Sequence, residues 1–503
     1  MKQVLIIVFL LLAVLAGYLY FYEPQTLDRL MGRETVANPI ADNGKGTIRK
    51  PNPKPKKPKT DHPIGTVPPQ AALSLPGDGM RYYLDGKPIA GPEVKAPSGT
   101  AVLVGYRDGQ YRHELIRLHA DQANQPQSAV ETLELGTSWD TFQGGSKRTG
   151  QLEATDRQRL EVIWKSQLGH KVQSSPILAG NIAYFASAKH LLNAVDLQSG
   201  KLLWSQGDVG SSVTPILNAQ FGFAGDNLGE FTGFRLRDGK PKGTARLDSY
   251  AISLGLISPE AFLAVTRSNT VYSIQTRKGV FGKLPLDVNW EVEVPELRGS
   301  QAVPVIANNR IIFQTEGHGL LALGLNDGSR AWPRTTGVSS ETFEPDAQSF
   351  VRDDVFLTPT PAANDELVFG LHEQNLIALD IANGQERWRT PLEIKPCSSI
   401  SLAFGMVIYG AGDGTIRAHS AIDGREIYVA EVSRKPVFAS PVIFADKLLV
   451  ATGEGAVKLL DCFSGEPLVE DESLAPSGID ATPAVSESGI LVINRRGDMV
   501  LYR

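Results

Sequence analysis

Short apolar stretches alternate with turn residues through most of the chain, and the same arrangement returns about every forty residues. The clearest copy has apolar runs at 176–178, 182–186 and 191–195, followed by Gly200 and Trp204. Runs of this length predict strands, and the Gly, Asn and Asp residues between them predict tight turns. One such unit cannot bury its own apolar face, so the repeat predicts a ring of four-stranded blades.

A turn glycine measures the period of the repeat. It recurs at Gly200, Gly239, Gly279, Gly328, Gly384, Gly424 and Gly465. Most steps are close to the roughly forty residues that four short strands need. The steps that end at Gly328 and Gly384 are longer, which indicates inserted loops in those two blades.

Three further landmarks recur in step with this glycine. A small residue and a proline, which lacks an N–H and suits the first residue of a strand, open the first strand at 175–176, 214–215, 303–304, 358–359, 440–441 and 482–483. The third strand ends in an aspartate at Asp196, Asp380 and Asp461. A large aromatic follows at Trp164, Trp204, Trp332 and Trp388, with Tyr428 in the same place in one blade. We interpret these tryptophans as structural plugs between neighbouring blades.

The last copy starts at Ala481 and stops at Arg503 with three strands and no fourth. A spare strand of the missing type lies upstream, at 160–164, and its Trp164 matches Trp204. We therefore predict that the two ends share one blade, because that pairing removes an open sheet edge. Seven complete copies and one composite blade predict an eight-bladed, all-β propeller over residues 137–503.

The stretch from Trp139 to Gly150 (WDTFQGGSKRTG), with Trp164 and the repeats that follow, resembles the quinoprotein-type (PQQ-like) β-propeller repeat family. The resemblance covers roughly residues 139–503. The family contains quinone-dependent dehydrogenases and also non-enzymatic scaffolds, such as the propeller lipoprotein of the outer-membrane β-barrel assembly machinery. The resemblance implies the fold, and the repeat alone does not choose between these functions.

The N-terminus carries nineteen residues without a charge, from Val4 to Tyr22. This run is long enough to span a bilayer, and we predict a transmembrane anchor at 1–23, with a cleaved signal peptide ending near Ala16 as the alternative. Position 18 is Tyr where a lipoprotein box would require Cys. We therefore expect a single-pass protein of the inner membrane with the bulk of the chain in the periplasm.

A Pro- and Lys-rich linker is predicted at 24–77, and a small β domain that weakly resembles PEGA-type β-sandwiches is predicted at 78–136. Strand patterns at 81–84, 99–106 and 111–118 support the β domain. The linker contains seven basic residues between Lys45 and Lys59, although the whole chain has a net charge of −5. The rest of the chain, without this linker, is therefore more acidic than the whole. Such a charge argues against nucleic-acid binding.

The candidates for chemistry are few. Cys397 and Cys462 fall in different blades, so we read them as buried small residues and not as a disulfide. The resemblance implies a vicinal cysteine pair and a calcium site for a quinone enzyme, and neither is recognisable here. His190 and His318 occupy a turn position that holds Gly or Asn elsewhere, and His113 and His119 are two ligands at most. We predict no cofactor, no metal and no catalytic residue.

The best candidate site is the insertion from Thr336 to Phe356. Its acidic and aromatic residues suit a loop that docks a partner protein, although a solvated acidic loop has the same composition. The residues are Glu341, Phe343, Glu344, Asp346, Phe350, Asp353 and Asp354.

We predict a non-enzymatic, membrane-anchored scaffold that binds an envelope or membrane protein, with a role in cell-envelope or outer-membrane protein assembly. Two alternatives stay open from the sequence. One is a PQQ-dependent oxidoreductase, and the other is an adhesin that binds cell-wall polysaccharide through the small domain.

Overall fold

The computed structural model describes residues 69–132, 139, 141–151, 159–172, 174–207, 213–226, 228–277, 279, 283–298, 300–316, 319–333, 358–471 and 477–503. Regular structure in these residues is β-strand, apart from three short 3₁₀ turns at η1 (Phe142–Gly144), η2 (Ala188–His190) and η3 (Pro295–Leu297). The predicted all-β class is therefore confirmed. The predicted anchor at 1–23 and most of the predicted linker lie outside the described residues.

Two small sheets form an N-terminal β unit, which we define as residues 70–132. Strand β1 (Gln70–Ser74) pairs with β4 (Glu93–Pro97), and the larger sheet has the order β3-β2-β5-β6-β7. Its strands are β2 (Arg81–Leu84), β3 (Lys87–Ile89), β5 (Gly99–Arg107), β6 (Gln110–Leu118) and β7 (Glu131–Thr132). Strand β1 lies in the range that the sequence assigned to the linker, because a single short strand beside Pro-rich sequence gives little pattern to read.

Eight further sheets follow in chain order, and we number them I to VIII. Sheets I to III are β9 (Ile177–Ala179), β10 (Ile182–Ser187), β11 (Leu191–Asp196), β12 (Leu202–Gln206); β13 (Ile216–Leu217), β14 (Phe221–Gly225), β15 (Glu230–Arg235), β16 (Pro241–Arg246); and β17 (Ala251–Ser258), β18 (Ala261–Thr266), β19 (Thr270–Thr276), β20 (Leu286–Glu293). Sheets IV and V are β21 (Val305–Ala307), β22 (Arg310–Gln314), β23 (Leu320–Gly324); and β24 (Ala362–Ala363), β25 (Leu367–His372), β26 (Asn375–Asp380), β27 (Glu386–Pro391).

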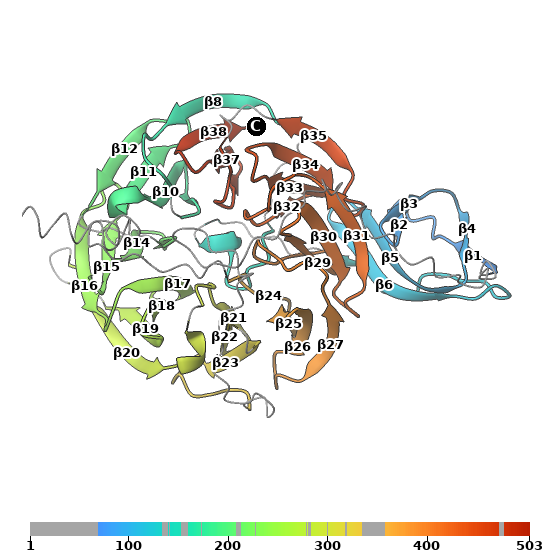
Figure 1. Ribbon diagram of the computed structural model, residues 1–503, viewed down its shortest axis with the longest axis horizontal. Coiled ribbons are helices and arrows are strands. Elements are labelled where there is room, and N and C mark those ends of the chain that lie inside the picture. The colour runs from blue at the N-terminus through green and yellow to red at the C-terminus, as the bar shows by residue number, and fades with distance from the viewer. Residues whose placement is uncertain are drawn as a thin grey trace, which may run out of the picture. The chain divides into compact units, whose positions relative to one another are not determined.

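Sheets VI and VII are β28 (Ser401–Ala403), β29 (Met406–Gly410), β30 (Thr415–Ser420), β31 (Glu426–Glu431); and β32 (Val442–Phe444), β33 (Lys447–Ala451), β34 (Val457–Asp461), β35 (Pro467–Asp471). Sheet VIII is β36 (Ala484–Ser486), β37 (Gly489–Ile493), β38 (Asp498–Tyr502) and β8 (Val162–Gln167). Figure 1 shows these sheets set around a common centre, with β8, β12, β16, β20, β27, β31 and β35 at the outside. This arrangement is a β-propeller.

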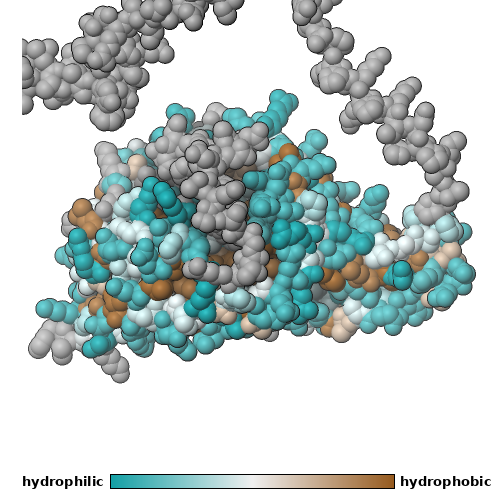
Figure 2. All heavy atoms as spheres, turned by 60° about the horizontal axis from the view of Figure 1, so that its bottom comes forward, coloured by the Kyte–Doolittle hydropathy of each residue, from teal (hydrophilic) through white to brown (hydrophobic). Residues whose placement is uncertain are grey.

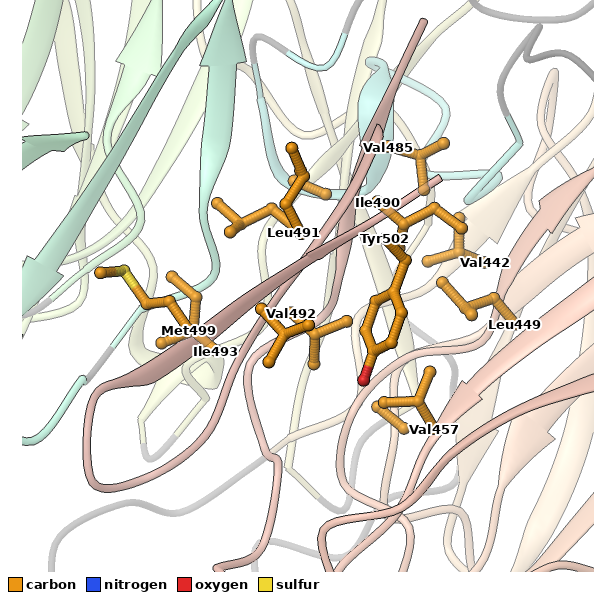
Figure 3. Close-up of a cluster of buried hydrophobic side chains, with 14 of the residues drawn as sticks. Val442, Leu449, Val457, Val485, Ile490, Leu491, Val492, Ile493, Met499 and Tyr502 are labelled. Carbon is orange, nitrogen blue, oxygen red and sulfur yellow. The ribbon is translucent and has the colours of Figure 1, made fainter. Parts of the chain in front are cut away.

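Sheet VIII contains the two ends of the propeller sequence. Strand β38 pairs antiparallel with β8, and Leu501 lies opposite Trp164. The pairing continues beyond the strands, since Glu161 and Arg503 exchange backbone hydrogen bonds of 3.1 and 2.8 Å. The pairing predicted from the incomplete last repeat is present. Figure 3 shows Tyr502 among the buried side chains of sheets VII and VIII, close to Val457.

In most sheets an aromatic side chain, on the outer strand or, in sheet IV, in the segment after β23, donates a hydrogen bond to the next sheet. The acceptor is in each case a carbonyl in the turn that follows the third strand of that next sheet. The pairs are Trp164 to Leu197 (2.7 Å), Trp204 to Leu236 (3.0 Å), Trp290 to Leu325 (3.3 Å), Trp332 to Ile381 (3.0 Å), Trp388 to Ala421 (2.9 Å) and Tyr428 to Cys462 (3.0 Å). The sequence analysis missed Trp290, because the insertion after Gly279 shifts it out of step.

The turn glycine makes room for this aromatic ring. A Cβ added at Gly200 would lie 2.7 Å from the Trp164 ring, and a Cβ added at Gly465 would lie equally close to the Tyr428 ring. Both glycines also have positive φ, so any other residue there would meet strain as well as contact. Gly279 is different: residues 283–285 fold back on it, and Leu284 fills the place between sheets II and III where an aromatic would lie.

Hydroxyl groups join the inner ends of the sheets. A Ser or Thr lies just before the first strand in several of the sheets. Its hydroxyl oxygen accepts a hydrogen bond from the backbone N–H of the equivalent residue in the preceding sheet. The pairs are Val303 to Thr360 (3.0 Å), Thr360 to Ser399 (3.1 Å), Ser440 to Thr482 (3.1 Å) and Thr482 to Ser175 (2.9 Å). In sheet V the matching pair is thus 360–361, two residues beyond the pair predicted from the sequence, because β24 begins only at Ala362.

Candidate protein-docking site

The acidic insertion predicted to dock a partner, from Glu341 to Asp354, lies outside the described residues. It therefore stays a prediction. The site that the structure does describe is elsewhere. It consists of the segment at the centre of the propeller and of the surface that holds the N-terminal β unit.

Residues 139 and 141–151 form a central segment that touches the innermost strands of five sheets. Figure 1 places η1, which belongs to this segment, near the middle of the ring. Its carbonyl groups accept backbone hydrogen bonds of 2.7 to 3.0 Å from sheets I, IV, V, VI and VII, at Leu178, Ile306, Ala363, Leu402 and Ile443. The central segment therefore links five sheets to one another across the propeller. Its backbone lies near the propeller axis.

Arg148 is the largest fully buried side chain of the central segment. Its guanidinium donates to the carbonyl of Pro304 at 3.2 Å, to the hydroxyl of Thr141 at 2.7 Å and to the carbonyl of Phe142 at 2.8 Å. Gln143 adds a bond of 3.0 Å to the carbonyl of Ile400. Buried charge is tolerated only when it is hydrogen-bonded, so these contacts hold the segment in one conformation.

The described residues do not fit a quinone cofactor with its metal. They contain no group of three or more His, Cys, Asp and Glu side chains arranged to hold a metal ion. Cys397 and Cys462 are free cysteines, and burial raises the pKa of the Cys397 thiol to about 11. His190 has a positive φ of 57°, as expected for a turn residue, and His318 lies outside the described residues.

The N-terminal β unit packs on sheets VI and VII through one face of its larger sheet. The centroid of the Tyr83 ring is 4.9 Å from that of Phe463, and the Tyr106 ring is 5.2 Å from Phe404 and 5.4 Å from Phe463. Val102 and Val104 from β5 join the same buried cluster. Because the opposite face of this sheet packs on β1 and β4 through residues such as Leu103, both faces are buried.

Polar contacts frame this apolar interface. Arg81 pairs with Asp446, the hydroxyl of Tyr83 donates to Asp461 at 3.0 Å, and Arg425 donates to the carbonyl of Thr100 at 2.8 Å. Burial alone would raise the pKa of Asp446, but hydrogen bonds from Lys447 and Arg81 hold that pKa below its usual range. The carboxylate is therefore charged at neutral pH.

His113 lies at the edge of the same interface. A Cβ added at Gly405 would be 2.2 Å from its Nδ1, so the imidazole rests directly on the glycine backbone. Its Nε2 is shielded from solvent and has no hydrogen-bond partner among the described residues. Burial lowers the pKa of His113 to about 4, and Asp423 opposes this only in part. His119 is exposed at the end of β6, so the two histidines do not form a site.

Sequence reasoning missed this docking surface, although it left a signal. Phe404 and Gly405 are the two turn residues between β28 and β29, with φ of 51° and 72°, where the equivalent turn of sheet IV has Asn308 and Asn309. Phenylalanine is a poor residue for positive φ, and Asn is a favoured one. Phe463 likewise occupies a turn position where the equivalent residues of other sheets, none of them aromatic, are Gln198, Arg237, Asn326, Ala382 and Ile422. Large aromatics in turns of a repeat therefore mark a covered surface.

The fold and the central segment define a PQQ-like β-propeller repeat protein. The family described as "Outer membrane protein assembly factor BamB" matches residues 140–281, 252–396 and 358–503. The chain belongs to this family, and the match covers nearly every strand of sheets I to VIII.

Individual relatives are distant. The chain is 22% identical over 330 residues to an outer membrane protein assembly factor BamB of Yersinia pestis, which covers 62% of this chain and 79% of the relative. The structure of BamB from Moraxella catarrhalis superposes with a TM-score of 0.52 at 15% identity, over 68% of this chain and 97% of that one. A quinohemoprotein alcohol dehydrogenase from Comamonas testosteroni gives 0.54 at 12% identity, over 73% and 80%. At these identities the superpositions show the fold alone.

The predicted inner-membrane location is wrong. The relatives carry the name of outer membrane protein assembly factors, which sets their work at the outer membrane. The prediction failed because an uncharged run of residues measures only hydrophobicity and does not tell one membrane from another. In the part of the chain that the structure describes, no helix has the length and apolar character needed to span a bilayer.

Proposed function

We propose that this protein is a non-enzymatic scaffold that holds partner proteins on the periplasmic side of the outer membrane during outer-membrane protein assembly. The observation that carries the proposal is the family match over residues 140–503. The propeller also holds one β unit already, on Phe404 and Phe463, which supports a role in binding folded domains.

The proposal takes sheets I to VIII as eight blades of one closed ring, with the N-terminal β unit as a separate small domain fixed to it. Contacts between β36 and β9, and between successive innermost strands from β9 to β32, support the ring. The pairing of β38 with β8 supports its closure. A rigid ring suits a scaffold, because its surface positions change little when a partner binds.

Deletion of the gene in the source organism tests the proposal. We expect lower amounts of outer-membrane β-barrel proteins, restored by the full chain in trans. Unchanged amounts of these proteins in the deletion strain would overturn the proposed function.

The proposal also assigns no cofactor chemistry to the propeller. The central segment links five sheets through its backbone and buries Arg148. The two cysteines lie in segments next to different sheets, since Cys397 precedes β28 of sheet VI and Cys462 follows β34 of sheet VII. Titration of the purified protein with pyrroloquinoline quinone, with and without calcium, should leave the quinone absorbance unchanged. Stoichiometric uptake would restore the oxidoreductase alternative.

A further inference from the structure

Each sheet has one rim position, which we define as the residue immediately before the aromatic that bonds to the next sheet, or before the residue that takes its place. It lies on the outer strand in seven sheets and after β23 in sheet IV, which has three strands. The strand registers align these positions, since Ala194 opposes Trp204, Ala418 opposes Tyr428 and Leu459 opposes Val469, each beside a register shift. In chain order the rim positions are Ile163, Leu203, Lys242, Asn289, Ala331, Arg387, Ile427 and Leu468.

The rim positions divide into an apolar group and a mainly polar group. Sheets VI, VII, VIII and I are neighbours, and they carry Ile427, Leu468, Ile163 and Leu203. Sheets II, III and V carry Lys242, Asn289 and Arg387. The apolar four lie on β31, β35, β8 and β12. These are consecutive outer strands of the ring in Figure 1. Figure 2 brings the bottom of the ring in Figure 1 forward and shows a mainly hydrophilic surface there, with hydrophobic residues among the hydrophilic ones.

One of the four apolar rim positions is covered and three are not. Ile427 is only 8% exposed, because the N-terminal β unit lies on it, with Gly86 against its backbone. Leu468 is 49% exposed, Ile163 42% and Leu203 50%. Three neighbouring outer strands therefore each expose a large aliphatic side chain, and exposed apolar surface that extends over several elements is a mark of interaction sites.

We propose that Leu468, Ile163 and Leu203 form a docking rim for a β domain of a separate partner protein, one that presents an apolar sheet face of aromatic and β-branched side chains. The inference rests on the proposed scaffold function. It extends an interface that is already present, since the N-terminal β unit covers the equivalent Ile427 with a face of this kind, built from Tyr83, Val102, Val104 and Tyr106.

A second copy of this chain is the weaker occupant. Its N-terminal β unit carries the matching face, but that face is already buried on its own sheets VI and VII.

Photocrosslinking in cells tests the docking rim with the full chain. A benzoylphenylalanine residue is placed at 163, 203 or 468, and as matched controls at Gln167, Ser205 and Glu470, which are exposed on the same three strands. We expect adducts from the three rim positions to one protein, with the crosslinked peptides, identified by mass spectrometry, on an apolar sheet face of a β domain. Adducts that involve only lipid or a second copy, adducts equally strong at the controls, or no adducts at all would overturn the proposal.

A triple variant, I163K/L203K/L468K, gives a second measurement. Compared with Q167K/S205K/E470K, it should retain the identified partner at least about tenfold less strongly, as for loss of a binding hot spot. Equal retention by both variants would contradict the docking rim. If the triple variant retains the partner while gene deletion still lowers outer-membrane proteins, the rim fails and the scaffold function stands. If crosslinks form as expected and deletion has no effect, the scaffold function fails alone.

Discussion

The indole nitrogen of Trp164 lies 2.7 Å from the carbonyl oxygen of Leu197, across the junction between sheets VIII and I. Trp164 belongs to β8, the strand that the start of the propeller sequence contributes to the last sheet. Strand β8 thus completes sheet VIII, and its Trp164 also bonds sheet VIII to sheet I. The opposite junction of the same sheet differs, because sheet VIII has no turn between β38 and β8. There Val469 replaces the aromatic, and the Tyr502 hydroxyl donates to Asp471 at 3.0 Å.

Trp332 should contribute more to stability than the other aromatics of this set. It is 6% exposed, whereas Trp204 is only half-buried. Trp332→Ala should cost about 3–5 kcal/mol of unfolding free energy, as for a large buried aromatic, and Trp204→Ala less. Urea unfolding checks the order. Trp204→Phe, which keeps an aromatic ring and removes the bond to Leu236, should cost less than Trp204→Ala, at about 1 kcal/mol for the lost hydrogen bond. The reverse order of the two alanine variants would contradict this account of the packing.

Replacing residues 162–167 by a Gly/Ser linker of equal length should open the edge of β38. An unpaired edge strand associates with other chains, so we expect a lower melting temperature and concentration-dependent oligomers. Light scattering after gel filtration, at two protein concentrations, measures this. Tyr502→Phe is the control, because it removes the hydroxyl bond to Asp471, keeps the buried ring and should leave a monomer. A stable monomeric linker variant would show that the shared strand is dispensable.

Phe404→Asn should weaken the contact between the N-terminal β unit and the propeller without destabilising the turn between β28 and β29. The change creates Asn-Gly, the favoured pair for a turn in which both residues have positive φ, and removes the ring that contacts Tyr106 and Tyr111. We expect faster hydrogen exchange in β2, β5 and β6, with unchanged exchange in β28 and β29. Asn308→Asp, in the corresponding turn of sheet IV, serves as the control. Unaltered exchange in β5 would mean that Phe404 does not hold the unit.

His113 should make the protein less stable in mild acid. Its pKa of about 4 in the folded protein is below the usual value near 6.5, so the unfolded chain takes up the proton first as pH falls. Stability should therefore decline between about pH 6.5 and pH 4, by at most roughly 1.4 kcal/mol per pH unit from this group. His113→Gln should reduce the decline in urea unfolding experiments, and His119→Gln, at an exposed position, should not. A wild-type slope in the His113 variant would refute the assignment.

The sequence by itself determined the repeat, the strand and turn pattern within it, and the sharing of sheet VIII. Each of these follows from local chemistry: apolar alternation, turn glycines such as Gly200, and a last repeat that stops one strand short at Arg503. The sequence also predicted the aromatic residues that bond to the next sheet, except Trp290. An insertion before Trp290 changes its distance from the turn glycine, so the repeat does not reveal it.

Only the tertiary structure decided where the central segment lies and what the N-terminal β unit contacts. The bonds from Leu178 and Ile443 to residues 139 and 150, and the contact of Tyr83 with Phe463, join residues far apart in the chain. No periodicity records such pairs, because a pattern along one segment reports which face is apolar and not what covers it. The same limit explains why Ile427 and Ile163 look alike in sequence, although one is buried and the other is exposed.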